Sequence, residues 1–334
     1  MRLSDAGPPR DTHVASLGGY QGVRFRSSPT FAGIAATAYP DPMGTPAAEF
    51  HVDVDLVAAL LRDQHPDLAD LPLRVVASGW DNVVVRAGDS LAVRLPRRAA
   101  AATLVEHEQR WLPTIAALVG DVVPVPEPVR TGRPALGYPW AWSVVPWFPG
   151  HPAGEQAQGV RVARDLAAVV TRLHVPAPPD APVNPVRAVP LATRSDAVLT
   201  RLATDDVPRA VELAVLWRTA AGAPTYTGPP VWVHGDLHPF NLLVESMPLG
   251  ARRLSAVVDF GDLTAGDPAV DLATRWLTFD DAGGRAFGAR VDADEATWTR
   301  ARGWAVSIAS ALAVTDDDAF RTVAARAIDA VLDG

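Results

Sequence analysis

The chain has 334 residues, of which 48% are hydrophobic and 20% charged, and its formal net charge of −8 argues against nucleic-acid binding, which needs a clustered basic face. The absence of cysteine excludes disulfides, thiolate metal sites and a cysteine nucleophile. Because the sequence has neither an apolar run long enough to span a membrane nor a signal peptide, we expect a cytoplasmic protein.

The N-terminal part of the chain changes character near residue 46. Residues 1–45 are rich in Gly, Pro and Ser and lack an apolar period, which predicts a disordered leader, and Met43 offers an alternative start. Apolar residues at helical spacing then predict an amphipathic helix over residues 52–65. Short β-branched runs separated by turns predict an antiparallel meander with strands at residues 73–79, 82–88 and 91–96.

Helical patterns dominate the remainder. The segment YPWAWSVVPWFPG, residues 138–150, is typical of a strand that ends in a linker bounded by Pro and Gly. Beyond residue 267 the pattern is helical almost throughout. Helices are also expected over residues 99–118, 160–174, 196–202 and 207–219.

This order of elements predicts an α+β, bilobal design with a small β-rich N-lobe and a large, mostly helical C-lobe. We place the N-lobe at residues 46–142, a hinge at residues 143–150 and the C-lobe at residues 151–334. The length of the chain is compatible with this division into two lobes.

Polar residues interrupt the apolar stretch VWVHGDLHPFNLLVE, residues 231–245. Asp236 and Asn241 have the Asp-x4-Asn spacing of a phosphotransfer catalytic loop, in which the carboxylate accepts the proton of the substrate hydroxyl and the amide oxygen binds a metal. Further on, Asp259 ends a β-branched run and begins an Asp-Phe-Gly triplet. Two hard oxygen ligands suit Mg²⁺, which fills its other positions with phosphate oxygens and water.

The motifs HGDLHPFN, VVDFGD and GDPAVDLA resemble those of the aminoglycoside phosphotransferase family, small-molecule kinases with the protein-kinase-like fold. The resemblance covers about residues 71–330. It implies that Asp236 is the catalytic base and that Asn241 and Asp259 hold magnesium. The chain departs from the pattern at Phe240, where many relatives have glycine.

The resemblance also implies a cation on the third strand, anchored by a helix glutamate. This chain has no lysine, since all 30 of its basic residues are arginine. The matching residue is Arg94, whose guanidinium can grip phosphate oxygens. Its expected partner is Glu108 rather than Glu106, because Glu108 begins an E-x-x-W-L-P pattern that resembles the family's. The alternatives are a surface arginine at a strand edge and a solvated glutamate.

The nucleotide base is expected at the hinge. Alignment by the closing glycine of SVVPWFPG offers the Pro146 carbonyl to the amino group of adenine and the Phe148 N–H to a ring nitrogen. Proline lacks a donor but needs only to accept at this position. The alternative is that Trp147 and Phe148 simply pack between the lobes. The SGWDN turn, residues 78–82, is expected to cover the phosphates.

The sequence therefore predicts a Mg²⁺-dependent kinase that transfers the γ-phosphate of ATP or GTP to a hydroxyl group of a small molecule, with Asp236 as base. Candidate acceptors are aminoglycoside or macrolide antibiotics, because acidic residues late in the chain can attract a cation, although helix caps explain those residues equally well. A housekeeping kinase for a sugar, amino alcohol or nucleoside fits the same motifs. The missing lysine keeps a second class open, a nucleotide-binding pseudokinase. The sequence leaves the oligomeric state open.

Three other polar residues near these motifs are interpreted as structural. His234 is expected to support the loop by hydrogen bonding. Asp267 and Asp271, in GDPAVDLA, are expected to cap a helix start and to anchor the loop, respectively.

Overall fold

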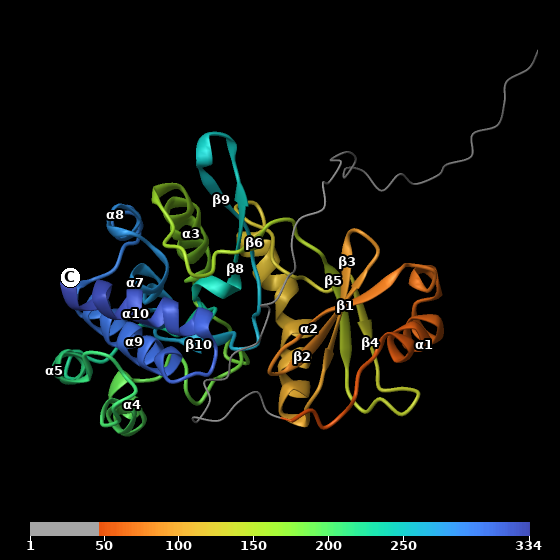
Figure 1. Ribbon diagram of the computed structural model, residues 1–334, viewed down its shortest axis with the longest axis horizontal. Helices are drawn as coiled ribbons and strands as arrows, with labels where there is room; N and C mark the ends of the chain where they lie inside the picture. Colours follow the sequence, from red (N-terminus) through yellow and green to blue (C-terminus); the bar gives the residue numbers. More distant parts are fainter. Residues whose placement is uncertain (1–46) are drawn as a thin grey trace, which may run out of the picture. The chain divides into compact units, whose positions relative to one another are not determined.

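The computed structural model describes residues 47–334, so the leader expected over residues 1–45 and the alternative start at Met43 lie outside the described residues. The described chain is a mixed α+β structure (Figure 1). None of its helices combines the length and the apolar character that crossing a lipid bilayer requires.

A five-stranded antiparallel sheet forms the first part of the described chain, with strand order β1-β2-β3-β5-β4. Its strands are β1 (Leu73–Ser78), β2 (Asn82–Ala87), β3 (Leu91–Pro96), β4 (Arg130–Gly132) and β5 (Trp142–Pro146). The first three form the meander that the β-branched runs predict. The central strands β2 and β3 are buried almost throughout, so their Val and Leu side chains pack on both faces of the sheet.

Two helices accompany this sheet, α1 (Val54–Gln64) and α2 (Ala99–Val119). Asp53 caps α1 by accepting a hydrogen bond from the Leu56 N–H at 2.9 Å. The buried residues of α1 join those of the sheet in one hydrophobic cluster. The buried face of α2 near Trp111 instead joins a second, larger cluster that fills the helical part of the protein. Helix α2 therefore ties the sheet to the rest of the fold.

Small strand pairs and helices make up the remainder of the structure. Its strands are β6 (His151–Pro152), β7 (Val231–Val233), β8 (Leu242–Ser246), β9 (Arg252–Val257) and β10 (Thr264–Gly266). They form a β6-β8-β9 sheet and a β7-β10 pair. Its helices are α3 (Val160–Leu173), α4 (Ser195–Leu202), α5 (Ala210–Ala221), α6 (Ala269–Leu272), α7 (Thr274–Thr278), α8 (Asp281–Gly288), α9 (Glu295–Ala313) and α10 (Asp318–Asp333).

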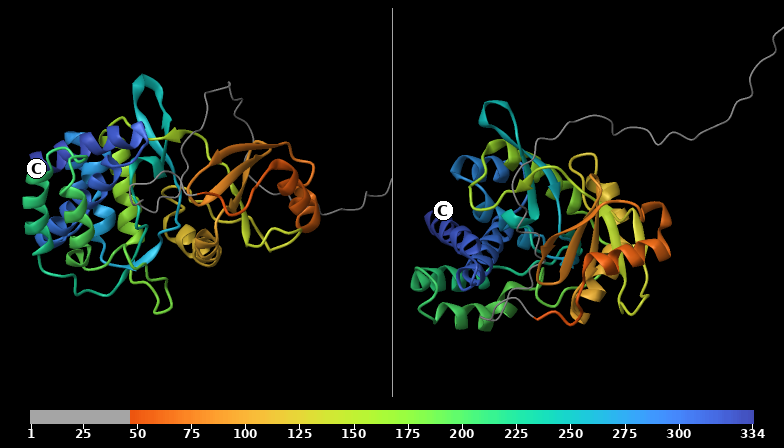
Figure 2. Two further views of the ribbon diagram at one scale, coloured as in Figure 1. Left: turned by 60° about the horizontal axis from the view of Figure 1, so that its bottom comes forward. Right: turned by 45° about the vertical axis from the view of Figure 1, so that its right-hand side comes forward.

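Helix α9 is the centre of this helical part, because it is buried along nearly its whole length and packs against α4, α5, α6, α7 and α10. Figures 1 and 2 show these helices gathered on the side of the β8-β9 hairpin that faces away from the five-stranded sheet. The tryptophans Trp217 and Trp304 are fully buried there. The division into lobes at residues 143–150 stays a prediction.

Candidate active site

The segment between β7 and β8 is a tight loop that its own histidine stabilises. The Asp236 N–H donates to His234 Nδ1 at 3.2 Å, so the ring proton lies on Nε2, which donates to the Val258 carbonyl at 3.0 Å. The His234 ring also lies 4.5 Å from that of Phe260. His234 therefore connects the loop to the Asp-Phe-Gly segment and is fully buried.

A buried carboxylate from α6 anchors the same loop. Asp271 accepts hydrogen bonds from the backbone N–H groups of His234 and Gly235, at 2.8 and 2.9 Å, and His174 Nε2 lies 3.1 Å from it. Asp267 Oδ1 accepts a hydrogen bond from the Ala269 N–H, just before α6, at 3.0 Å, and the Asp267 carboxylate is paired with Arg300. Both aspartates thus hold backbone in place.

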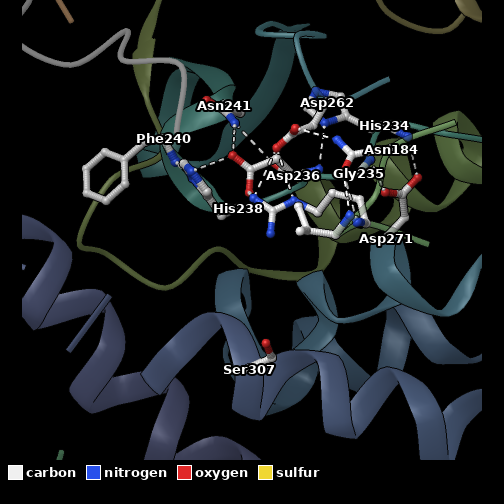
Figure 3. A network of polar contacts seen from close by, with 12 residues as sticks. Asn184, His234, Gly235, Asp236, His238, Phe240, Asn241, Asp262, Asp271 and Ser307 are labelled. Carbon is white, nitrogen blue, oxygen red and sulfur yellow. Dashed lines mark hydrogen bonds and ion pairs between the residues drawn. The ribbon is translucent and has the colours of Figure 1, made fainter. Parts of the chain in front are cut away.

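Asp236 projects from this loop, and donors from separate segments contact both of its carboxylate oxygens (Figure 3). Arg187 Nη2 lies 3.3 Å from Oδ1, and Asn241 Nδ2 lies 3.3 Å from Oδ2. His238 Nε2 is also 3.3 Å from Oδ2, and it carries the ring proton because Nδ1 accepts from the Phe240 N–H. These contacts fix the orientation of the carboxylate.

Asn241 and Asp259 present the two oxygens that a metal ion would need. Asn241 Oδ1 and Asp259 Oδ2 are buried, and neither has a hydrogen-bond partner among residues 47–334. Their backbones are adjacent, because the Val258 N–H donates to the Asn241 carbonyl at 2.9 Å. Buried oxygens without partners are costly, and a cation would satisfy them.

This donor set fits magnesium, which uses one or two protein oxygens with phosphate oxygens and water. In the described part of the chain no group of three or more His, Asp or Glu side chains forms a metal cage. The backbone of Asp259 is left-handed, with φ of +64°, a strained conformation for a residue with a side chain. Such strain costs about 1–3 kcal/mol and is typical of functional sites.

Electrostatics at Asp259 reflect its burial. Burial raises the pKa of Asp259 from 3.8 to about 7. The positive charge of Arg94 opposes this increase, whereas the negative charges of Glu108, Asp236 and Asp81 add to it. The excess of carboxylates over cations around Asp259 favours a bound cation.

Arg94 points into the same region from β3 and is paired with Glu108 of α2. Its Nη1 donates to both carboxylate oxygens of Glu108, at 3.0 and 2.9 Å, whereas Glu106 is exposed. Arg94 Nη2 lies 3.9 Å from Asp259 Oδ1. Burial by itself lowers the pKa of Arg94, but the charges of Glu108 and Asp259 raise it above the ordinary arginine value. Arg94 therefore carries its charge in the site.

A pocket lies between the sheet and the β8-β9 hairpin, and both Arg94 and Asp259 line it. Its apolar walls come from Val84, Ala92, Val145, Leu243 and Val258, and its edge comes from Pro146, Trp147 and Phe148. The Trp147 N–H donates to the Ser90 carbonyl at 2.7 Å, which directs the backbone groups of Trp147 toward β3. Because backbone groups alternate along a strand, the carbonyl of Pro146, the last residue of β5, faces away from β3.

The turn at residues 78–82 closes between β1 and β2 through a hydrogen bond from the Gly79 N–H to the Asn82 carbonyl. Arg97 donates to the Gly79 carbonyl at 2.7 Å, and Asp81 forms a partly buried ion pair with Arg98. The charge of Asp81 contributes to the pKa increases of both Arg94 and Asp259. The turn therefore lies near the charged end of the pocket.

The structure thus brings Asp236, Asn241 and Asp259 together and places Arg94 and Glu108 beside Asp259. Pro146 and Phe148 line the same pocket as Arg94. Sequence reasoning missed His238 and Arg187, and also Asp262, whose Oδ2 lies 3.0 Å from Arg187 Nη2. His238 carried a local signal, since it lies inside the HGDLHPFN motif, whereas Arg187 comes from a proline-rich segment without any motif.

A mixed α+β fold in which Asp236, Asn241 and Asp259 come together beside a pocket lined by Arg94 and Asp259 fits a small-molecule phosphotransferase. The sequence matches the model of the phosphotransferase enzyme family over residues 72–304. The chain belongs to this family, which confirms the resemblance stated above.

Solved structures show the same fold. One is the GDP complex of wild-type aminoglycoside 2'-phosphotransferase-IIIa, with a TM-score of 0.61 and 20% identity, covering 84% of this chain and 99% of that chain. The apoenzyme of macrolide 2'-phosphotransferase MphH from Brachybacterium faecium gives a TM-score of 0.56 and 23% identity, and the match covers 78% of this chain and 90% of that chain. For the GDP and kanamycin complex of APH(2")-IIia, the TM-score is 0.59 and the sequence identity is 19%. The match covers 76% of this chain and 90% of that chain. A comparison with curated proteins gives no significant match.

Proposed function

We propose that this enzyme transfers the γ-phosphate of ATP or GTP to a hydroxyl group of a small molecule in a Mg²⁺-dependent reaction. The observation that carries the proposal is the pair of buried oxygens without partners, Asn241 Oδ1 and Asp259 Oδ2, next to the Asp236 carboxylate. Buried polar groups are normally hydrogen-bonded, so two such oxygens beside the Asp236 carboxylate support a site for a cation.

Each residue then has a role that its position supports. Asp236 accepts the proton of the acceptor hydroxyl, and its fixed carboxylate orients that hydroxyl for attack. Arg94, held by Glu108, contacts the phosphates of the nucleotide. Asn241 and Asp259 hold magnesium, which neutralises charge on the phosphates when bound.

The nucleotide base fits the hinge edge of the pocket. There the Pro146 carbonyl accepts a hydrogen bond and the Phe148 N–H donates one, and the apolar walls of the pocket cover the flat faces of the ring. Both ATP and GTP remain candidates, and relatives of similar fold have been solved with GDP.

The acceptor that the comparisons favour is an aminoglycoside or a macrolide, the substrate classes in the names of the similar structures. A sugar, amino alcohol or nucleoside is compatible with the same site. Three of the acidic residues late in the chain, Asp280, Asp294 and Asp317, are helix N-caps, so these three have a structural role without a cationic acceptor. The buried Trp217 and Trp304 belong to the core rather than to an acceptor surface.

A pseudokinase remains the second candidate, since the chain has no lysine. The Arg94–Glu108 pair argues against it, because a buried arginine placed 3.9 Å from Asp259 supplies the cation that lysine provides elsewhere in the fold.

A screen for acceptors tests the proposal directly. Purified protein is incubated with Mg²⁺, either ATP or GTP, and kanamycin, erythromycin, sugars or amino alcohols, and release of the diphosphate is measured together with the mass of the product. The Asp236→Asn variant is the matched blank, because it keeps the shape of the side chain. The proposal fails if wild-type protein phosphorylates no acceptor and hydrolyses neither nucleotide.

A further inference from the structure

Arg187 is a buried cation outside the site predicted from the sequence. It lies in the segment between α3 and α4, and it is only 3% exposed. Its Nη2 lies 3.0 Å from Asp262 Oδ2 and 3.3 Å from Asp236 Oδ1. Its Nε donates to Asp262 Oδ2, also at 3.0 Å. Arg187 thus bridges the carboxylate of Asp236 and that of Asp262, which follows Asp259 by three residues.

The local structure around Arg187 holds it in this position. The Asn184 side-chain oxygen accepts from the N–H groups of Val186 and Arg187, at 2.9 and 3.1 Å, which closes a turn. The Asn184 side-chain nitrogen donates to Asp262 Oδ1 at 2.8 Å. Asn184 therefore fixes both the arginine and the carboxylate that receives it.

The same segment is bonded to β10 along its length. The Ala265 N–H donates to the Pro182 carbonyl at 2.9 Å, and the Asp267 N–H donates to the Ala188 carbonyl at 3.1 Å. Ala188, the residue after Arg187, has a φ of +53°, a strained backbone for alanine. These bonds and this strain indicate a rigid support rather than a surface loop.

The contacts of Asp236 show what this support does. Asn241 and His238 both contact Oδ2, and both belong to the catalytic loop itself. Arg187 contacts Oδ1 and comes from a different part of the chain. Fixing both oxygens from two independent segments prevents rotation of the carboxylate, and a base must hold its acceptor hydroxyl in a narrow range of orientations.

We propose that Arg187, supported by Asp262 and Asn184, is a positioning residue that orients Asp236 for phosphate transfer. This inference rests on the proposed function. The role requires a guanidinium, because one planar group contacts two carboxylates through Nε and Nη2, and a lysine ammonium offers a single point of contact.

The test compares kcat, the KM for ATP and the affinity for MgADP in wild-type protein and variants, with kanamycin, erythromycin and water as acceptors. We expect Arg187→Met to lower kcat about 100-fold while KM for ATP and MgADP affinity change less than about threefold. Arg187→Lys is expected to recover little of the loss. The control is Arg209→Met, since Arg209 also bridges two carboxylates, Glu212 and Asp329, but on the exposed surface.

Arg187→Met alone leaves the partly buried Asp262 and the buried Asp236 without this cation, which can unfold the protein. The double variant Arg187→Met/Asp262→Asn removes both charges and is expected to fold yet keep the loss in kcat. Recovery of the double variant to within about threefold of wild-type kcat would show that Arg187 serves only to neutralise Asp262, and would overturn the inference. The inference is also overturned if wild-type protein is active and the Arg187→Met variant has the same kcat. A wild type inactive with every acceptor instead overturns the proposed function and this inference with it.

Discussion

Arg94 and Glu108 are joined through a single nitrogen: Arg94 Nη1 donates to both oxygens of the Glu108 carboxylate, at 3.0 and 2.9 Å. This leaves Nη2 on the side of Asp259, 3.9 Å from its Oδ1. The buried Arg94 Nε has no hydrogen-bond partner among the described residues. The pair therefore anchors the guanidinium while keeping part of it available for phosphate oxygens.

Replacing Arg94 should affect catalysis and stability together. We expect Arg94→Ala to lower kcat/KM for ATP by about 10²–10³-fold, because a charged group at the phosphates is lost. It also leaves Glu108 buried without a cation, which costs about 3–5 kcal/mol in the free energy of unfolding. Steady-state kinetics and denaturant unfolding measure the two effects.

The double variant Arg94→Met/Glu108→Gln separates these effects. It removes both buried charges, so most of the stability should return while the kinetic loss remains. Kinetics close to wild type in the double variant would contradict a phosphate-binding role for Arg94.

The raised pKa of Asp259 predicts a pH dependence of nucleotide binding. With this pKa at about 7 rather than 3.8, the carboxyl group is largely protonated below pH 7 in the metal-free protein and cannot ligate a metal. The gain in ADP affinity on adding Mg²⁺ should therefore shrink as the pH falls from about 8 to 6. Calorimetric titration at several pH values measures it. In the Asp259→Asn variant, Mg²⁺ should increase ADP affinity only slightly at every pH. If Mg²⁺ increased the ADP affinity of wild-type protein equally at every pH, the prediction would be contradicted.

Much of the fold and part of the site were predictable because local signals encode them. The β-branched runs separated by turns predict β1, β2 and β3, and apolar spacing predicts the long helices to within a few residues. The strand β10 was missed because its three residues, Thr264–Gly266, are too few to show a period. Asp236 and Asn241 were predicted from their Asp-x4-Asn spacing and Asp259 from the Asp-Phe-Gly triplet, and the structure brings the three residues together.

Contacts between distant segments were not predictable in the same way. Arg187 lies 49 positions before Asp236 along the chain, and nothing in its proline-rich surroundings distinguishes it from other arginines. Its burial depends on the pairing of its segment with β10, which only the tertiary structure shows. In the sequence, only the motif distinguishes Glu108 from Glu106 as the partner of Arg94. In the structure, Glu108 lies on the buried face of α2 and Glu106 on its exposed face.

Gly235 should be intolerant of any side chain. Its φ is +86°, and a Cβ atom there would lie 2.5 Å from the Asp262 carbonyl oxygen. We expect Gly235→Ala to displace the loop that carries Asp236 and to lower kcat by about 10²-fold. The matched control is Gly137→Ala, where φ is +83° but no atom lies within 4 Å of the added Cβ. The control should lose about 1–2 kcal/mol of stability and keep its activity. Equal kcat values in the two variants would contradict a steric role for Gly235.

The acidic residue Asp294 should act as a helix cap rather than attract a cationic acceptor. Its Oδ1 accepts from the Thr297 N–H at 2.7 Å, and hydrogen bonding to Thr297 lowers its pKa.

We therefore expect Asp294→Ala to cost about 1 kcal/mol of stability and Asp294→Ser, which keeps a capping oxygen, to cost less. Because the pKa of Asp294 is lowered in the folded state, the stability that its charge contributes is present above the unfolded pKa and is lost as the pH falls through the folded pKa. Thermal unfolding at neutral and acidic pH measures these effects. If a cationic acceptor such as kanamycin is a substrate, its KM should be the same in wild type and Asp294→Ser, since the cap and not the charge is what α9 requires. If Asp294→Ser instead raised this KM tenfold, the charge of Asp294 would contribute to binding the cationic acceptor, and the prediction would be wrong.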